Sequence, residues 1–95
     1  MFIIELTYKA PNEQIDQYLS AHRIFLDRYY AAGKFIASGA KIPREGGIIL
    51  AQASSKEEIS RIITEDPFHQ HELADYRIIE FIAGKKANNI QDLIA

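Results

Sequence analysis

The chain has 95 residues, of which 47% are hydrophobic and 25% are charged, and its formal net charge is −2. These proportions are those of one soluble globular domain, and they exclude the disordered, collagenous and low-complexity classes. With 11 basic against 13 acidic residues, no surplus of cations exists to neutralise a phosphate backbone, so we expect no nucleic-acid partner.

The first part of the chain shows a strand, a helix and a second strand. Residues 2–9 alternate with a period of two, which predicts a strand with a strongly apolar face. Residues 11–32 carry an apolar stripe at steps of three, four and seven, as one amphipathic helix does, and Gly33 follows where a left-handed cap would lie. Residues 34–42 return to a strand pattern.

The second part repeats this order after a turn at residues 43–47, with a third strand at 47–53. Ser55 and Glu58 have the spacing of a capping box, which predicts a helix that runs to about residue 64. Asp66-Pro67 then opens a short helical turn through residue 72, and residues 75–82 form the fourth strand. Asn89 caps a last short helix.

The order strand, helix, strand, strand, helix, strand predicts an α+β fold, the ferredoxin-like βαββαβ sandwich, with both helices on one face of the sheet. The third and fourth strands are nevertheless apolar on both sides. An exposed apolar sheet face marks an interface, and the simplest partner is a second copy of the chain. We therefore expect a homodimer of the dimeric α/β barrel type, with residues 1–83 as the domain. Residues 84–95 form an extension that packs on the dimer through Ile90, Leu93 and Ile94.

Two features that the sequence lacks limit the chemistry and the location that we expect. No cysteine occurs, which excludes disulfides, thiolate nucleophiles and cysteine-based metal sites. No apolar run approaches the roughly 20 residues that span a bilayer, and the opening five residues lack the features of a secretory signal. We therefore expect a cytoplasmic protein without a membrane partner.

His22 stands out because it lies between Leu19 and Leu26 on the apolar stripe of the first predicted helix. A core histidine that bonds a backbone carbonyl is the more common explanation, since buried polar groups are usually satisfied. The sharper hypothesis is a general acid or base in an apolar pocket. Asp66 is explained structurally as a helix cap, but it is also a carboxylate that can fix the tautomer of His22.

Other chemistry-bearing residues give weaker signals. Ser38-Gly39 lies inside the second strand, where glycine marks either a bulge, which is favoured, or the close approach of a ligand. His69 and His71 are two apart on a helical turn and point to different sides, so we expect surface residues and no metal site.

Five short segments in order resemble the YciI-like, or YCII-related, proteins over about residues 1–83. They are Phe2-Ile3-Ile4-Glu5-Leu6-Thr7-Tyr8, Ala21-His22-Arg23-Ile24-Phe25-Leu26, Gly33-Lys34-Phe35-Ile36-Ala37-Ser38-Gly39, Glu65-Asp66-Pro67-Phe68 and Tyr76-Arg77-Ile78-Ile79-Glu80-Phe81. The resemblance implies a ferredoxin-like dimer and a site made of His22 and Asp66. Relatives include enzymes acting on small-ring lactones and chloroaromatic compounds that need no metal or organic cofactor. The chain departs from the usual glycine-proline pair at Gly39-Ala40.

Two functions remain open. The first is a cofactor-independent lyase, isomerase or dehalogenase in which His22 moves a proton on a small, partly apolar ring and Asp66 holds its tautomer. Ser38 or an amide near Gly39 then binds the developing oxyanion. The second is a non-catalytic dimeric module that binds a small molecule or supports a partner domain. We expect His22 and Asp66 to meet at a pocket whose predicted walls are Tyr8, Phe25, Tyr29, Ser38 and Phe68.

Overall fold

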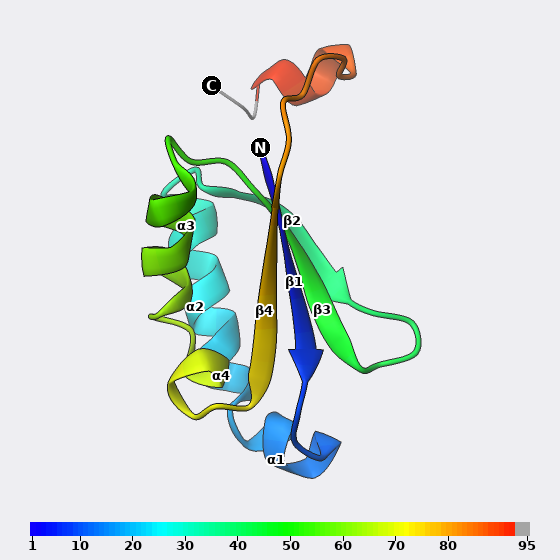
Figure 1. Cartoon of the computed structure of the whole chain (residues 1–95), viewed down its shortest axis with the longest axis vertical. Coiled ribbons are helices and arrows are strands. Elements are labelled where there is room, and N and C mark those ends of the chain that lie inside the picture. Colours follow the sequence, from blue (N-terminus) through cyan, green and yellow to red (C-terminus); the bar gives the residue numbers. More distant parts are fainter. Residues whose placement is uncertain (93–95) are drawn as a thin grey trace.

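The computed structural model describes residues 1–92 and consists of one four-stranded antiparallel sheet covered on one face by helices (Figure 1). The strand order is β2-β3-β1-β4, with β1 Phe2–Tyr8, β2 Phe35–Ala40, β3 Gly46–Ala51 and β4 Ala74–Glu80. The two longest helices are α2 (Leu19–Ala31) and α3 (Lys56–Ile63), which lie on the same side of the sheet. This arrangement confirms the predicted ferredoxin-like α+β fold.

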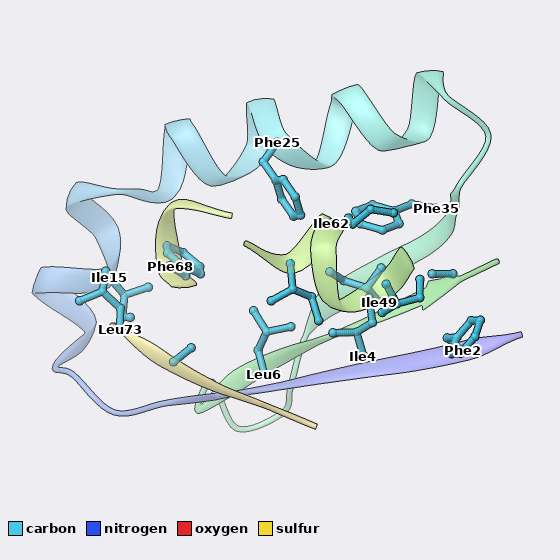
Figure 2. Close-up of a cluster of buried hydrophobic side chains, with 14 residues drawn as sticks. Phe2, Ile4, Leu6, Ile15, Phe25, Phe35, Ile49, Ile62, Phe68 and Leu73 are labelled. Carbon is cyan, nitrogen blue, oxygen red and sulfur yellow. The ribbon is translucent and has the colours of Figure 1, made fainter. Parts of the chain in front are cut away.

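The predicted single helix over residues 11–32 is wrong, because the chain forms two helices there. α1 spans Asn12–Gln17, and Tyr18, with φ −109° and ψ 4°, separates it from α2. The break redirects α1, so that Ile15 is buried in the core at one end of the sheet while Phe25 is buried in its middle (Figure 2). Two separately aimed helices bury both side chains, which a straight helix aligned on the sheet would not do.

The core lies between the sheet and α2, α3 and α4 (Pro67–Gln70), as Figure 2 shows. The period of two in β1 is confirmed, since Phe2, Ile4 and Leu6 are all buried. From the helices, the buried members include Phe25, Ile59, Ile62 and Phe68. Burial of such side chains is worth about 1.5–3 kcal/mol each, so this cluster fixes how α2 and α4 sit against the sheet.

The face of the sheet opposite the helices carries apolar side chains. Ile3 pairs with Leu50 of β3 on one side and with Ile79 of β4 on the other, so the three share that face. Ile48 and Ile79 are each 37% exposed to solvent. Ile49, in contrast, is 3% exposed and belongs to the core. The predicted homodimer through this face stays a prediction.

Two glycines differ from their predicted roles, and one agrees. Gly33 has φ 74° after α2, as predicted for a left-handed cap. Gly46 is part of β3 rather than of the turn, and a Cβ there would lie 1.8 Å from the Leu6 carbonyl oxygen. The bulge expected at Ser38-Gly39 is absent from that place, because both residues pair regularly with β3; the register shift falls instead between Phe35 and Ala37.

After β4 the chain continues past the end of the sheet to a short 3₁₀ helix, η1 (Asn88–Asp92) (Figure 1). Of the apolar residues that the sequence assigns to the extension over 84–95, Ile90 is partly buried, whereas Leu93 and Ile94 lie outside the described residues. Packing of the extension on a partner stays a prediction. Among residues 1–92, none of the helices combines the length and apolar character needed to cross a membrane.

Candidate active site

Asp66 is held rigidly at the start of α4. Its backbone is extended, with φ −74° and ψ 125°, and its Oδ1 accepts a hydrogen bond from the Phe68 backbone N–H at 3.0 Å. Pro67 occupies the first helical position, where its missing N–H costs nothing. The side chain of Asp66 is fully buried. A buried carboxylate requires several donors, because each oxygen loses its contacts with water.

His22 supplies one of those donors from α2. Its Nδ1 lies 2.8 Å from Asp66 Oδ1, across 44 residues of sequence. The ring also stacks on Phe68, with centroids 4.1 Å apart and planes 7° from parallel. The His22 side chain is 12% exposed, so the imidazole is largely shielded but still reaches the surface of the protein. The α4 turn thus fixes both the carboxylate and the plane of the imidazole.

Tyr76 of β4 completes the cluster and was missed by the sequence analysis. Its hydroxyl donates to Asp66 Oδ2 at 2.7 Å. Burial, followed by the neighbouring Asp66 charge, raises the pKa of Tyr76 above its ordinary value, so the phenol remains a donor. A signal for it exists in the sequence, because the period of two places Tyr76 on the same face of β4 as buried Ala74.

These contacts assign the protonation pattern of His22. An ionised carboxylate has no proton to give, so the His22–Asp66 bond places the proton of a neutral imidazole on Nδ1. Nε2, on the other side of the ring, then carries the free electron pair. Within residues 1–92, the His22 side chain makes no other hydrogen bond. Nε2 is therefore the atom of this cluster that can accept a proton from a ligand.

His22 lines a pocket of about 240 Å³ between α2 and strands β1, β2 and β3. Its wall on α2 consists of Leu19, His22, Arg23 and Leu26. The facing wall includes Tyr8 from β1, Ser38 and Gly39 from β2, and Ile48 and Ile49 from β3. Ser38 and Gly39 are exposed, so the pocket opens to solvent on that side. It is a mostly apolar recess with a few polar groups, as small-molecule sites are.

Of the predicted wall residues, Tyr8 and Ser38 line this pocket, whereas Phe25, Tyr29 and Phe68 do not. Gly39, whose amide was predicted to bind an oxyanion, also lines it. Phe25 and Phe68 are buried members of the core, and Phe68 supports His22 from below the ring plane rather than facing a ligand. The Tyr29 hydroxyl instead donates to Glu65. Burial and that bond raise the pKa of Tyr29, and the same bond lowers the pKa of Glu65.

Two further polar residues escaped the sequence analysis, one bonded to the pocket residue Ser38 and one in the pocket wall. The Tyr30 hydroxyl lies 2.7 Å from Ser38 Oγ, which ties this part of β2 to α2. Arg23 is exposed and follows His22 directly on the helix. His69 and His71 are exposed, as predicted, and the part of the chain that the structure describes contains no group of three potential metal ligands.

Among solved structures, the chain is similar to a 5-chloro-2-hydroxyhydroquinone dehydrochlorinase from Burkholderia phenoliruptrix AC1100, solved in complex with 2,5-dihydroxybenzoquinone. The TM-score is 0.75 with 19% sequence identity, and the match covers 87% of this chain and 94% of the other. At that identity the likeness shows a shared fold. No curated protein matches the chain.

The family assignment rests on the sequence itself. The model of the YCII-related domain matches residues 1–82, which include both His22 and Asp66. This match covers most of the chain and ends just after β4, where the sheet is complete. The chain therefore belongs to the family of YCII-related domain proteins.

Proposed function

We propose that this protein is a cofactor-independent enzyme in which His22 and Asp66 carry out acid–base chemistry on a small, partly apolar cyclic substrate. The observation that carries the proposal is the 2.8 Å bond between His22 Nδ1 and a fully buried Asp66, with His22 in the wall of a pocket. A base held by a second, oriented group is the arrangement that proton transfer requires.

The reaction begins when His22 Nε2 removes a proton from a ring carbon next to a carbonyl group. The electron pair of the broken C–H bond moves onto the carbonyl oxygen and forms an enolate, while Asp66 stabilises the new imidazolium. In an isomerase, the imidazolium returns the proton to another carbon. In a lyase or dehalogenase, the electron pair expels a leaving group such as chloride, and the proton is lost to solvent. General acid–base help of this kind is worth about 10²–10⁴ in rate.

The β2 wall faces the developing oxyanion in this proposal. Ser38 Oγ accepts or donates in its bond with Tyr30; when Tyr30 donates, the Ser38 proton is free for a ligand. Gly39 lacks a side chain, and an added Cβ would meet nothing within 4 Å, so its backbone leaves room for a ring. Donors aimed at a developing charge are commonly a large part of catalysis.

The alternative is a non-catalytic module that binds a small molecule or supports a partner domain. If this alternative holds, His22 should have no access to a cavity and should bond only to the backbone, as a satisfied core histidine does. The bond to Asp66 and the place of His22 in the pocket wall favour the enzyme. The dehydrochlorinase that shares the fold supports the same choice, because the molecule bound in its structure, 2,5-dihydroxybenzoquinone, is a small oxygenated ring.

A screen of the purified chain against unsaturated lactones, muconate-like acids and chlorinated hydroquinones tests the proposal. Product formation and chloride release are followed for wild type, His22→Ala and His71→Ala. His71 is an exposed histidine outside the pocket whose ring packs on Tyr18 rather than on the Asp66 cluster, so it serves as the matched control. We expect turnover that His22→Ala reduces by about 10²-fold or more and that His71→Ala leaves unchanged. Turnover that survives in His22→Ala, or small-molecule binding without any turnover across the panel, contradicts the proposal.

A further inference from the structure

Arg23 is the cation among the four α2 residues that line the pocket. Leu19, His22, Arg23 and Leu26 line the pocket at the spacing i, i+3, i+4 and i+7, which is one face of a helix. Two of these four are leucines, and His22 is the proposed base. An arginine in the remaining position gives the pocket wall a permanent positive charge beside the reacting group.

Arg23 also differs from the other cations near this end of the sheet because it has no carboxylate partner. Arg44, whose guanidinium lies 5.8 Å from the Tyr8 ring centre, is bonded to Asp16 at 2.6 Å. Lys41 lies 3.4 Å from Glu5. Within residues 1–92, the Arg23 side chain forms neither an ion pair nor a hydrogen bond. Its donors are therefore available to a ligand.

The facing wall offers the guanidinium no internal counter-charge. The residues across the pocket are Leu6, Tyr8, Ser38, Gly39, Ala40, Gly47, Ile48 and Ile49. None of them is acidic, and most are apolar. A bound anion would therefore meet the Arg23 charge without competing against a carboxylate of the same pocket.

We infer that Arg23 selects substrates that carry an anionic oxygen group, a carboxylate or a phenolate, on a single ring. This inference rests on the proposed function, which it narrows to one substrate class. The guanidinium presents paired donors that match two oxygens, and the adjacent His22 then faces the ring. The pocket volume of about 240 Å³ lies below the range of sites for drug-sized molecules, which suits one ring and its substituents.

The inference is tested by comparing how the protein binds two probes, one charged and one neutral. Benzoate and benzamide have nearly the same shape and differ in charge, and their affinities are measured by NMR titration of the isotope-labelled protein. The proteins compared are wild type, Arg23→Gln and Arg61→Gln. Arg61 is an exposed arginine of α3 outside the pocket, so its variant makes the same change in net charge. Glutamine is a good helix former, so both variants should fold.

We expect wild type and Arg61→Gln to bind benzoate more tightly than benzamide, with shifts at Ser38, Gly39 and His22. Arg23→Gln should lower benzoate affinity by about tenfold and leave benzamide affinity unchanged. Equal affinity for the two probes in wild type, no binding of benzoate, or an equal loss in both variants overturns the inference. Because the readout is binding, these outcomes do not depend on turnover. An Arg23-dependent preference together with full turnover in His22→Ala would overturn the proposed function alone.

Discussion

The hydroxyl of Tyr76 donates to the Asp66 carboxylate oxygen that does not contact His22. The bond measures 2.7 Å, while His22 and the Phe68 backbone N–H share the other oxygen. The carboxylate is thus held from β4, from α2 and from its own turn. This three-sided support fixes the direction in which Asp66 faces the imidazole, and it depends on β4, the edge strand that pairs with β1.

Replacement of Tyr76 by phenylalanine should weaken the protein and change how its stability depends on pH. Loss of the donor leaves a buried carboxylate oxygen unpaired, which costs about 1–3 kcal/mol in the free energy of unfolding. The raised pKa of Tyr76 means that the unfolded chain releases this proton near its ordinary value of 10.0 while the folded chain retains it. Stability is therefore fully present below that value and falls as the pH rises above it.

Denaturant unfolding of wild type and Tyr76→Phe between about pH 9 and 11 measures this effect. Above about pH 10, Tyr76 should lower the free energy of unfolding by up to about 1.4 kcal/mol per pH unit. This contribution should be missing from the variant. Tyr29, whose pKa is also raised, contributes equally to both proteins and cancels in the comparison. The same pH dependence in the two proteins would show that Tyr76 does not retain its proton in the folded state.

The His22 and Asp66 variants should separate catalysis from stability. His22→Ala should nearly abolish turnover of a converted substrate, because the base itself is lost. Asp66→Asn should impair turnover less, because the base His22 remains, although the amide no longer holds its tautomer or stabilises the imidazolium. Asp66→Ala should also lower stability, with about 0.5–2 kcal/mol from the lost cap alone. Rate measurements and thermal unfolding of the same three variants distinguish an effect on catalysis from an effect on stability. If all three variants lower the melting temperature and none lowers the rate per folded molecule, the pair is structural.

The sequence predicted part of this site and missed the rest for identifiable reasons. His22 was conspicuous because a polar ring interrupted an apolar helix stripe, and Asp66 because aspartate-proline starts a helix. Their contact depends on how α2 and α4 lie on the sheet, which no local pattern determines. Tyr76 and Arg23 gave no such contrast, since tyrosine is ordinary in a strand and arginine in a helix. Their roles follow from which side chains meet across elements.

The two isoleucines Ile49 and Ile79 should respond differently to a charge, although the sequence did not distinguish them. Ile49→Asp places a carboxylate in the core at a position that is 3% exposed, so this variant should not fold. Ile79→Asp changes the open face and should yield a folded monomer. Light scattering at micromolar concentration, with circular dichroism as the check on folding, gives the answer. A wild-type protein of monomeric mass would refute the predicted dimer.

Gly46 should be intolerant of a side chain, whereas Gly39 should accept one. A Cβ at Gly46 would overlap the Leu6 carbonyl oxygen at 1.8 Å, so β3 and β1 must separate, at a cost of about 3 kcal/mol or more. A Cβ at Gly39 meets nothing within 4 Å, and Gly39→Ala should keep wild-type stability within about 0.5 kcal/mol. Equilibrium unfolding of the two alanine variants tests the pair. Equal stability of both would mean that the close approach at Gly46 does not constrain the sheet.

The order of the strands and main helices could be predicted because each element carries its own period and its own end signals. Ser55 caps α3 and Gly33 follows α2, both as expected. The break at Tyr18 could not be predicted, since residues 11–32 contain no internal proline or glycine and the apolar stripe runs through it. There the requirement to bury both Ile15 and Phe25 outweighs the local helix preference.

The protonation pattern of His22 tests the central claim most directly. Long-range ¹H–¹⁵N NMR of histidine-labelled protein, titrated with acid and base, identifies which ring nitrogen carries the proton when the imidazole is neutral. We expect His22 to carry this proton on Nδ1 and to take up the second proton on Nε2, and we expect Asp66→Asn to reverse or mix the two tautomers. A neutral His22 with its proton on Nε2, or a tautomer that Asp66→Asn leaves unchanged, would contradict that claim.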